Sequence, residues 1–165
     1  MLGRELSGSY SRRQFKVRYQ TDLARRHSDE TFTAAVFSLE DLEAVIAAVG
    51  HNRAQEMIRA LGARLNSHFG KEGGFAARRR IGEIAAVLPF SDVKEAERIL
   101  SDFKEQLRRH GPDWLGCRGG EKGAQAGSVE FVILAGVAPG KHQIELESVM
   151  EFARFNQKEI ASFRC

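Results

Sequence analysis

The sequence has little cysteine, no long apolar run and no cluster of metal-binding side chains. The two cysteines, Cys117 and Cys165, match no metal-site spacing and predict free thiols in a reducing, cytoplasmic compartment. The five histidines share no ligand spacing either, so we expect no bound metal and no cofactor. No apolar segment approaches the ~20 residues of a membrane span, and the polar, basic start predicts no signal peptide.

The chain also has no large excess of positive or negative charge. The formal net charge is +3 over 165 residues, which permits attraction to phosphates but does not by itself indicate nucleic-acid binding. The chain also lacks aromatic residues interleaved on a basic face, so nucleic acid is a disfavoured partner. The hydrophobic and charged fractions of 42% and 28% fit a globular domain.

Hydrophobic periodicity predicts alternating helices and strands. Helical spacing indicates helices at residues 11–26, 39–49, 53–69, 144–163 and from a cap at Ser91 or Asp92 to about residue 110. Short apolar runs indicate strands at residues 32–37, 75–80, 84–88 and 129–135. We expect Asn52 to cap a helix, residues 111–127 to form a glycine-rich loop, and Gly136 and Pro139 to end the last strand. With no repeat and no linker, this order predicts one α+β domain over residues 1–165.

The most informative segment is a predicted β-hairpin with an arginine-rich tip. Arg78, Arg79 and Arg80 lead into a turn at Ile81-Gly82, which is followed by Glu83 and a buried strand. Strand alternation sends Arg79 to the opposite face from the other two arginines. The run predicts a phosphate or partner contact, with a merely solvated face as the alternative. Glu83 is the one carboxylate there, and pairing with an arginine is favoured over a residual catalytic role.

Five local motifs, in order, resemble the GGDEF domain family, which includes bacterial diguanylate cyclases. Residues 6–15 resemble the opening L-T-G-L-x-N-R-R-x-F, and Gly50-His51 with residues 57–61 resembles G-H-x-x-G-D-x-x-L. Residues 80–89 lie where the family has G-G-D-E-F and an apolar strand. Residues 131–138 resemble S-I-G-V-A, and residues 150–158 match the spacing of the closing A-D-x-A-L-Y-x-A-K helix. The resemblance implies a nucleotidyl-cyclase-like fold, with a mostly antiparallel five-stranded sheet wrapped by helices.

The resemblance also implies which positions are chemical. In active relatives an Asp at the end of the first strand and an acid in the hairpin hold two Mg²⁺ ions for phosphoryl transfer. Ser38 and Gly82 stand at these positions, and Glu83 matches the second hairpin acid. Because Mg²⁺ prefers carboxylate oxygens, the resemblance implies a degenerate metal site.

Substrate and product contacts depart from the family pattern as well. Ile46 and Gln55 fall where the family contacts guanine with Asn and Asp, and Arg80 and Ile81 fall where two glycines let the triphosphate approach. Residues 71–74 lack the R-x-x-D product-inhibition motif. Lys158 matches a phosphate-contacting lysine of the closing helix, with a solvated surface lysine as the alternative.

These departures predict a catalytically inactive GGDEF-like signalling domain that acts through protein contact in cyclic di-GMP-related bacterial regulation. We expect a protein partner or a neighbouring domain, and one of Phe152 and Phe155 is expected to be exposed for it. The alternatives are a non-catalytic sensor that binds GTP or cyclic di-GMP through Arg78–Arg80 and Lys158, and a residually active cyclase that uses Glu40 and Glu83.

Overall fold

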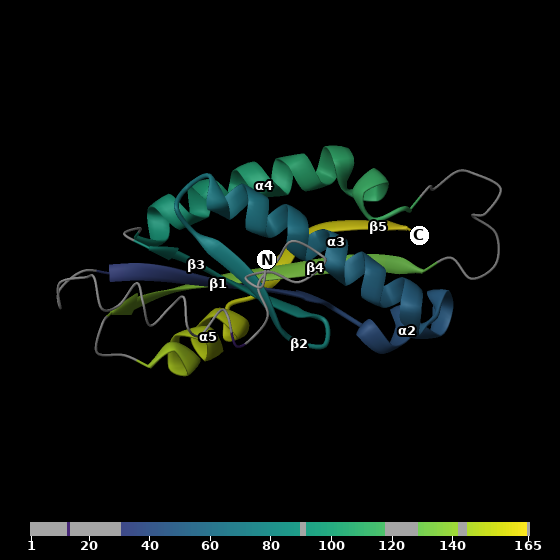
Figure 1. The fold of residues 1–165 in the computed structure, drawn as a ribbon, viewed down its shortest axis with the longest axis horizontal. Coiled ribbons are helices and arrows are strands. Elements are labelled where there is room, and N and C mark those ends of the chain that lie inside the picture. The colour runs from purple at the N-terminus through teal and green to yellow at the C-terminus, as the bar shows by residue number, and fades with distance from the viewer. Residues whose placement is uncertain (1–12, 14–30, 90–91, 118–128, 142–144, 165) are drawn as a thin grey trace.

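The computed structural model describes residues 13, 31–89, 92–117, 129–141 and 145–164 (Figure 1). Five strands form one sheet in the order β2-β3-β1-β4-β5, and every neighbouring pair is antiparallel. The strands are β1 (Thr31–Leu39), β2 (Phe75–Arg80), β3 (Glu83–Pro89), β4 (Glu130–Lys141) and β5 (Lys158–Arg164). The helices are α2 (Leu42–Val49), α3 (His51–Gly70), α4 (Val93–Trp114) and α5 (Leu146–Phe155). The predicted α+β class and the antiparallel sheet are confirmed.

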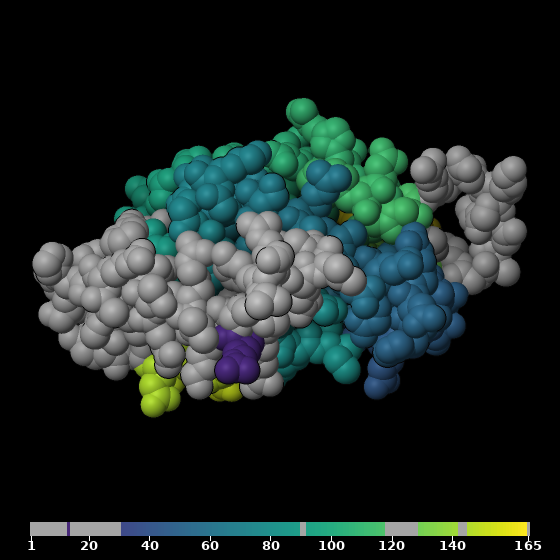
Figure 2. All heavy atoms as spheres, viewed as in Figure 1, coloured from purple at the N-terminus to yellow at the C-terminus, as the bar shows by residue number. Residues whose placement is uncertain are grey.

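The helices cover both faces of the sheet. α3 and α4 lie over one face, and α5 lies over the other (Figure 1). In the space-filling view, α2, α3 and α4 form much of the upper and right-hand surface (Figure 2). Strand alternation sorts the core accordingly, because Ala35 and Phe37 of β1 join the α3–α4 cluster while Ala34 and Val36 join the α5 cluster. Within the described residues, no helix has the length and apolarity needed to cross a membrane.

The first part of the chain follows the predicted order with shifted boundaries. The predicted helix at residues 11–26 lies outside the described residues, apart from Arg13. α2 begins at Leu42, where the Asp41 carboxylate accepts a hydrogen bond from the Ala44 amide at 3.1 Å. α3 begins directly after Gly50, whose φ of 92° turns the chain between the two helices. The expectation that Asn52 caps α3 is therefore wrong.

α4 continues past the predicted end near residue 110. It runs to Trp114 and carries Pro112 within its last turn. The ring of Phe163 packs on Gly111, where an added Cβ would lie 3.0 Å from Cε1 of that ring. This tertiary contact involves a residue far away in sequence, so local pattern could not reveal that the helix continues into the predicted loop.

β4 also runs further than predicted, through both residues that were expected to stop it. Gly136 is needed because the backbone of α5 comes so close that an added Cβ would collide with the Ala153 carbonyl oxygen. Pro139 pairs with Thr33 of β1. On its other side β4 pairs with β5 only as far as Ala135, so Pro139 lies on an open edge, where a missing N–H is tolerated.

The largest correction concerns the end of the chain. The predicted helix at residues 144–163 is in fact a shorter helix, α5, followed by strand β5. Ile160 fits a helical repeat in sequence, but it lies in β5, and Phe163 stacks on Phe131 of β4 with ring centroids 5.9 Å apart. The edge of β4 supplies the hydrogen-bonding partner that makes this segment a strand, and helical periodicity carries no information about that partner.

Cys117 is buried and disulfide-bonded, so the expected free thiol at this position is wrong. Sequence spacing excluded a metal site but could not exclude a tertiary sulfur contact. The other cysteine of the chain, Cys165, lies outside the described residues. A disulfide-bonded Cys117 does not indicate a reducing compartment, and cytoplasmic localisation stays a prediction.

Candidate functional site

The β2–β3 hairpin has the geometry that the sequence predicts. Its turn is formed by Ile81 and Gly82, between the ends of β2 and β3. Gly82 has a φ of 76°, a conformation that side-chain-bearing residues rarely adopt, and an added Cβ would lie 2.9 Å from Cδ2 of Leu42. Ile81 is 70% exposed. Both the backbone conformation and the neighbouring Leu42 side chain therefore favour glycine at this turn.

The end of β1 lies beside this turn. Ser38 is the register partner of Glu83, and the Leu39 amide donates to the Gly82 carbonyl oxygen at 3.4 Å. The two positions at which the family resemblance expects metal ligands, Ser38 and Gly82, therefore lie together at one end of the sheet. Ser38 belongs to β1, and Gly82 lies in the turn directly before β3, whose register against β1 is fixed by the antiparallel ladder.

Glu83 forms a two-point ion pair with Arg154 of α5. The guanidinium Nε and Nη2 donate to its two carboxylate oxygens at 2.6 and 3.2 Å, and the side chains are only 9% and 18% exposed. The hydrogen bond to Glu83 is the main reason that the pKa of Arg154 lies above its ordinary value, and partial burial opposes this rise. Arg80, at 4.0 Å, is a weaker second partner. The prediction that Glu83 pairs with an arginine is confirmed, but the main partner is Arg154 of α5 and not a neighbouring arginine of the hairpin.

Arg79 forms a second connection between the hairpin and α5. Its buried guanidinium pairs with Glu147 in the first turn of α5. Arg78 points to the opposite face and donates to the Gln55 side-chain oxygen of α3 at 3.3 Å. The prediction that Arg78 and Arg79 lie on opposite faces is therefore confirmed, whereas the pairing of β2 with β3 becomes irregular between Arg78 and Arg80, so strict alternation does not extend to Arg80. Sequence reasoning missed Glu147 and Arg154, because a helix partner across the sheet leaves no local signal.

Of the residues that the family resemblance places at the nucleotide, some line a surface hollow and one packs against the core. A shallow hollow of about 380 Å³ is lined by Gln55, Ile58, Arg78, Arg79, Arg80, Ile81 and Gly82. Ile46 does not line it, because its side chain is half-buried against the α3–α4 core. Near the hairpin the hollow presents guanidinium groups and one side-chain amide, which can bind anions but do not provide carboxylate oxygens for a cation.

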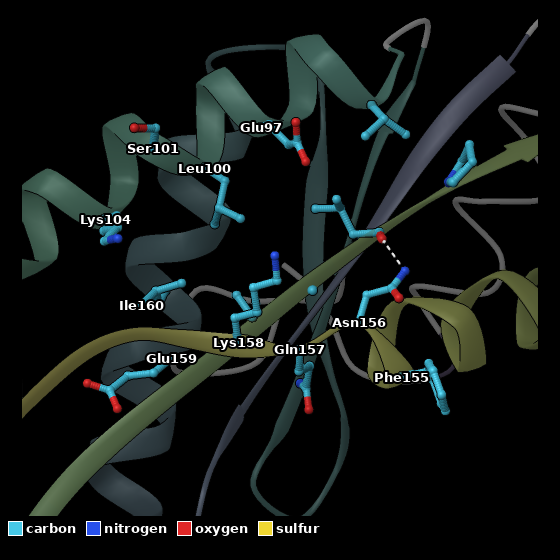
Figure 3. Close-up of a pocket in the computed structure, with 15 residues that line it drawn as sticks. Glu97, Leu100, Ser101, Lys104, Phe155, Asn156, Gln157, Lys158, Glu159 and Ile160 are labelled. Atoms are coloured by element: carbon cyan, nitrogen blue, oxygen red, sulfur yellow. Dashed lines mark hydrogen bonds between the residues drawn. The ribbon is translucent and has the colours of Figure 1, made fainter.

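Lys158 lies in a different place from these residues. It is the first residue of β5 rather than part of the closing helix, and it lines a hollow between α4 and β4 (Figure 3). Its register partner is Ala135, a residue of the α3–α4 core, whereas Glu83 meets α5. The structure therefore does not bring Lys158 together with Arg78–Arg80.

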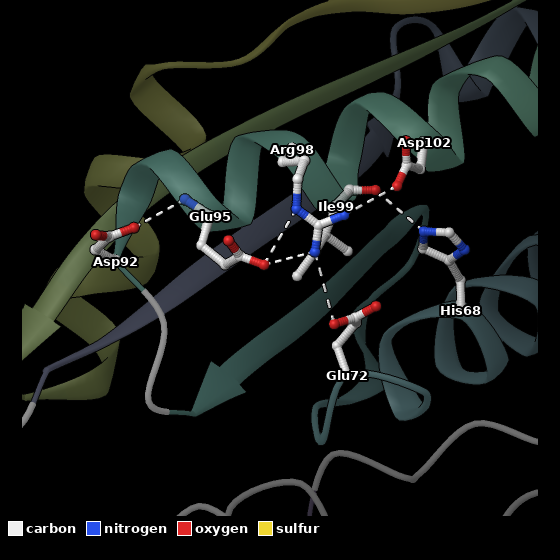
Figure 4. Close-up of polar contacts among 7 residues, drawn as sticks. All are labelled: His68, Glu72, Asp92, Glu95, Arg98, Ile99 and Asp102. Atoms are coloured by element: carbon white, nitrogen blue, oxygen red, sulfur yellow. Dashed lines mark hydrogen bonds and ion pairs between the residues drawn. The ribbon is translucent and has the colours of Figure 1, made fainter.

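The segment where the family carries its product-inhibition motif is held by an ion-pair cluster. Arg98 of α4 contacts Glu72 at 3.8 Å, Glu95 at 2.5 Å and Asp102 at 3.3 Å (Figure 4). The hydrogen bond to Glu95 is the main cause that raises the pKa of Arg98. His68 lies nearby, with Nε2 3.0 Å from the Ile99 carbonyl oxygen. This cluster ties α4 to the turn after α3.

No group of three or more His, Cys, Asp or Glu side chains in the described part of the chain could hold a metal ion. Glu40 is exposed and lies just after β1, and Glu83 is occupied by Arg154. The residues present near the hairpin therefore fit a magnesium ion poorly.

The chain is similar to proteins of one known family. The family described as "Diguanylate cyclase, GGDEF domain" matches residues 5–153. The GGDEF domain of DgcB from Caulobacter crescentus, solved in complex with c-di-GMP, has a TM-score of 0.70 and 18% identity, covering 93% of this chain and 86% of that one. The FimX GGDEF domain from Pseudomonas aeruginosa has a TM-score of 0.67 and 17% identity, with coverages of 94% and 91%.

A third similar structure is diguanylate cyclase SiaD from Pseudomonas aeruginosa, in complex with its activator SiaC. It has a TM-score of 0.67 and 16% identity, and the match covers 93% of this chain but 55% of that one. At such identities the structural likeness shows the fold alone. No curated protein matches the chain.

Proposed function

Since the chain belongs to the GGDEF domain family, we propose that it is a catalytically inactive member that acts through protein contact in cyclic di-GMP-related signalling. The family and the fold relate it to cyclic di-GMP signalling. Loss of catalysis and action through a protein partner are the parts of this proposal that experiments must test.

The observation that carries the proposal is the ion pair between Glu83 and Arg154. A cation at the hairpin would have to displace a guanidinium that already holds both oxygens of a nearly buried carboxylate. Ser38, across the ladder, offers a hydroxyl, which is a weaker ligand for Mg²⁺ than a carboxylate. Two-metal phosphoryl transfer requires both ions, so this site lacks its chemical basis.

The surroundings of the hairpin also disfavour guanine. Ile46 cannot hydrogen-bond a base edge, and Gln55 is engaged by Arg78. Each polar group of guanine that is buried without a partner costs about 1–3 kcal/mol. These losses are independent of the missing metal ligands, and they support inactivity for a separate reason.

A protein partner fits the exposed surface. Phe152 and Phe155 of α5 are 63% and 88% exposed, so both members of the pair that sequence reasoning singled out are available for contact. Within the same fold, SiaD forms a complex with a protein activator. A protein partner or a neighbouring domain is therefore the first candidate for what this domain contacts.

A non-catalytic anion sensor is the second candidate. Arg78 and Arg80 line the hollow beside the hairpin, and guanidinium groups bind phosphates well. DgcB, a protein of the same fold, binds c-di-GMP. A residually active cyclase that relies on Glu40 and Glu83 is disfavoured, because Arg154 occupies Glu83.

Incubation of the chain with Mg-GTP, followed by chromatography for pppGpG and cyclic di-GMP, tests the proposal. We expect no product, and product formation above a no-protein control would overturn inactivity. Calorimetric titration with GTP and cyclic di-GMP, at near-physiological salt, separates the two candidates. Flat titrations favour the partner-binding domain, and binding without turnover favours the sensor.

A further inference from the structure

One exposed side of α5 combines two aromatic side chains with a groove. Ser148, Glu151, Phe152 and Phe155 are all exposed, and they line a groove of about 410 Å³. These four residues, which form the α5 face, follow one another at the spacing of three and four that places side chains on one side of a helix. Phe152 and Phe155 are 63% and 88% exposed. Clustered exposed aromatic side chains mark a surface that binds another molecule.

The charge on and beside the α5 face is negative. The Glu151 side chain, in the middle of the face, is 75% exposed, and Glu145 and Glu147 are exposed at the start of the helix. The one cationic residue of α5 is Arg154, whose side chain is only 18% exposed and donates two hydrogen bonds to Glu83. The α5 face therefore presents two phenyl rings beside carboxylates.

α5 is fixed in place, which orders this face before any partner arrives. Arg154 and Glu147 connect the helix to the hairpin through ion pairs with Glu83 and Arg79. The opposite side of the helix is buried in the core and carries Val149, Met150 and Ala153. A surface that is already ordered loses little conformational entropy on binding, so more of the contact energy appears as affinity.

We propose that the α5 face binds a basic amphipathic helix of another protein. Apolar side chains of that helix pack between Phe152 and Phe155, and its lysine or arginine side chains lie against Glu151 and Glu147. The inference rests on the proposed function, because it names the chemistry of the protein partner through which the domain is proposed to act.

The shape of the α5 face argues for a helix as the occupant. The groove follows one side of α5 from Ser148 to Phe155, a length of two turns or about 10 Å. Helices pack by fitting rows of side chains of one into the grooves between rows of the other. An amphipathic helix supplies apolar side chains at the same three- and four-residue spacing, which is the usual mode of helix recognition in a groove.

The charge of the α5 face argues against other occupants. A second copy would bring the same carboxylates together, and like charges across an interface repel. An anionic membrane surface or a nucleic acid would be repelled for the same reason. A helix that carries lysine or arginine beside its apolar side chains complements both the rings and the carboxylates.

Fluorescence anisotropy of a labelled synthetic peptide tests the proposal. The probe is a helical peptide with leucine at three- and four-residue spacing and lysine on both flanks of the leucine stripe. The control peptide has glutamate in place of lysine. We expect the full chain to bind the lysine peptide at least about tenfold more tightly than the glutamate peptide at near-physiological salt. Added salt should reduce this preference, because exposed charges are screened.

Two pairs of variants locate the binding surface. Phe155→Ala should weaken binding of the lysine peptide at least about tenfold because a buried ring is lost, whereas Ile81→Ala, at a 70% exposed residue of the hairpin turn, should leave it unchanged. Glu151→Lys should weaken binding about fivefold or more. Glu56→Lys makes the same charge change at a 63% exposed side chain of α3 and should have less than about a twofold effect. Circular dichroism verifies that all four variants fold.

Several outcomes would overturn the inference. These are no binding of either peptide, equal affinity for both, or binding that Phe155→Ala leaves unchanged. Two further outcomes would reveal a different occupant: self-association in sedimentation equilibrium that Phe155→Ala abolishes, or Phe155-dependent binding to vesicles of equal parts phosphatidylcholine and phosphatidylglycerol. The Mg-GTP assay on the same samples reports on the proposed function separately. A chain that forms no product and binds neither peptide would retain the proposed inactivity and lose only the partner proposed for α5.

Discussion

Arg154 of α5 holds Glu83 of β3 through two hydrogen bonds of 2.6 and 3.2 Å. The two residues are 71 positions apart in sequence, and neither side chain is more than 18% exposed. A second pair, Arg79 with Glu147, lies on the same side of the sheet. α5 is thus fastened at two points to the hairpin on which function was expected to depend.

Arg154→Ala should destabilise the fold by about 2–3 kcal/mol. Breaking a buried pair leaves the remaining charge without compensation, and the partial exposure of Arg154 reduces the full penalty. Urea denaturation monitored by circular dichroism measures the loss. Arg109→Ala removes an exposed pair with Glu105 and serves as the control, with an expected change below about 0.5 kcal/mol. Equal effects of the two variants would contradict the importance of the Glu83 pair.

The contribution of Arg154 should be constant from neutral to alkaline pH. Its pKa is raised on folding, so its stabilising effect is complete below the ordinary arginine pKa and is lost only when the pH passes the raised value. The difference in unfolding free energy between wild type and Arg154→Ala should therefore stay flat from about pH 7 to 10. A difference that shrinks over this interval would show that another group titrates with the pair.

The hairpin shows how much local sequence can specify. The glycine turn, the opposite faces of Arg78 and Arg79, and the buried strand β3 were all predictable, because each depends on near neighbours or on a period of two. The order of the elements, together with the family motifs, was enough for the fold. The sequence predicted that Glu83 contacts an arginine, but it could not identify Arg154, because tertiary packing brings that residue to Glu83.

The C-terminal part shows why the rest was not predictable. A helical repeat continues through Ile160, yet the backbone changes to β5 because the edge of β4 offers hydrogen bonds. Gly136 and Pro139 carry local signals for termination, but an approaching helix and an unpaired edge make both acceptable within β4. In each case the deciding partner is distant in sequence.

Gly136→Ala should destabilise the protein by about 2–4 kcal/mol. An added Cβ would meet the backbone of α5 at the Ala153 carbonyl oxygen and would lie 2.8 Å from the Gln157 nitrogen, so the helix would have to move. Gly70→Ala is the control, because no atom lies within 4 Å of its added Cβ and its position at the end of α3 tolerates alanine. Urea denaturation compares the two, and a neutral Gly136→Ala would show that α5 packs less closely.

The two hollows should respond separately to nucleotide titration. If the domain binds cyclic di-GMP or GTP at the hairpin, then Arg78→Ala with Arg80→Ala should weaken that binding at least about tenfold, because charge-assisted phosphate contacts are lost. Lys158→Ala should leave it unchanged, since Lys158 lines the other hollow. Calorimetry measures both, and a strong effect of Lys158→Ala would place the ligand beside α4 instead.

Restoring the metal ligands should not restore cyclase activity. Ser38→Asp with Gly82→Asp supplies two carboxylates, and aspartate is among the residues that tolerate the left-handed conformation of Gly82. The new Cβ at residue 82 would lie 2.9 Å from Leu42, so Leu42→Ala is needed in the same variant to make room.

We expect this triple variant to bind Mg²⁺ more tightly than wild type in calorimetry but to produce no detectable pppGpG or cyclic di-GMP. Ile46 still offers no hydrogen bond to guanine, and Gln55 is still engaged by Arg78, at about 1–3 kcal/mol for each unpaired polar group. Adding Ile46→Asn and Gln55→Asp to the triple variant separates the two requirements. Turnover that appears only with all five changes would support independent losses of metal and base recognition, whereas turnover in the triple variant would mean that the base pocket is still functional.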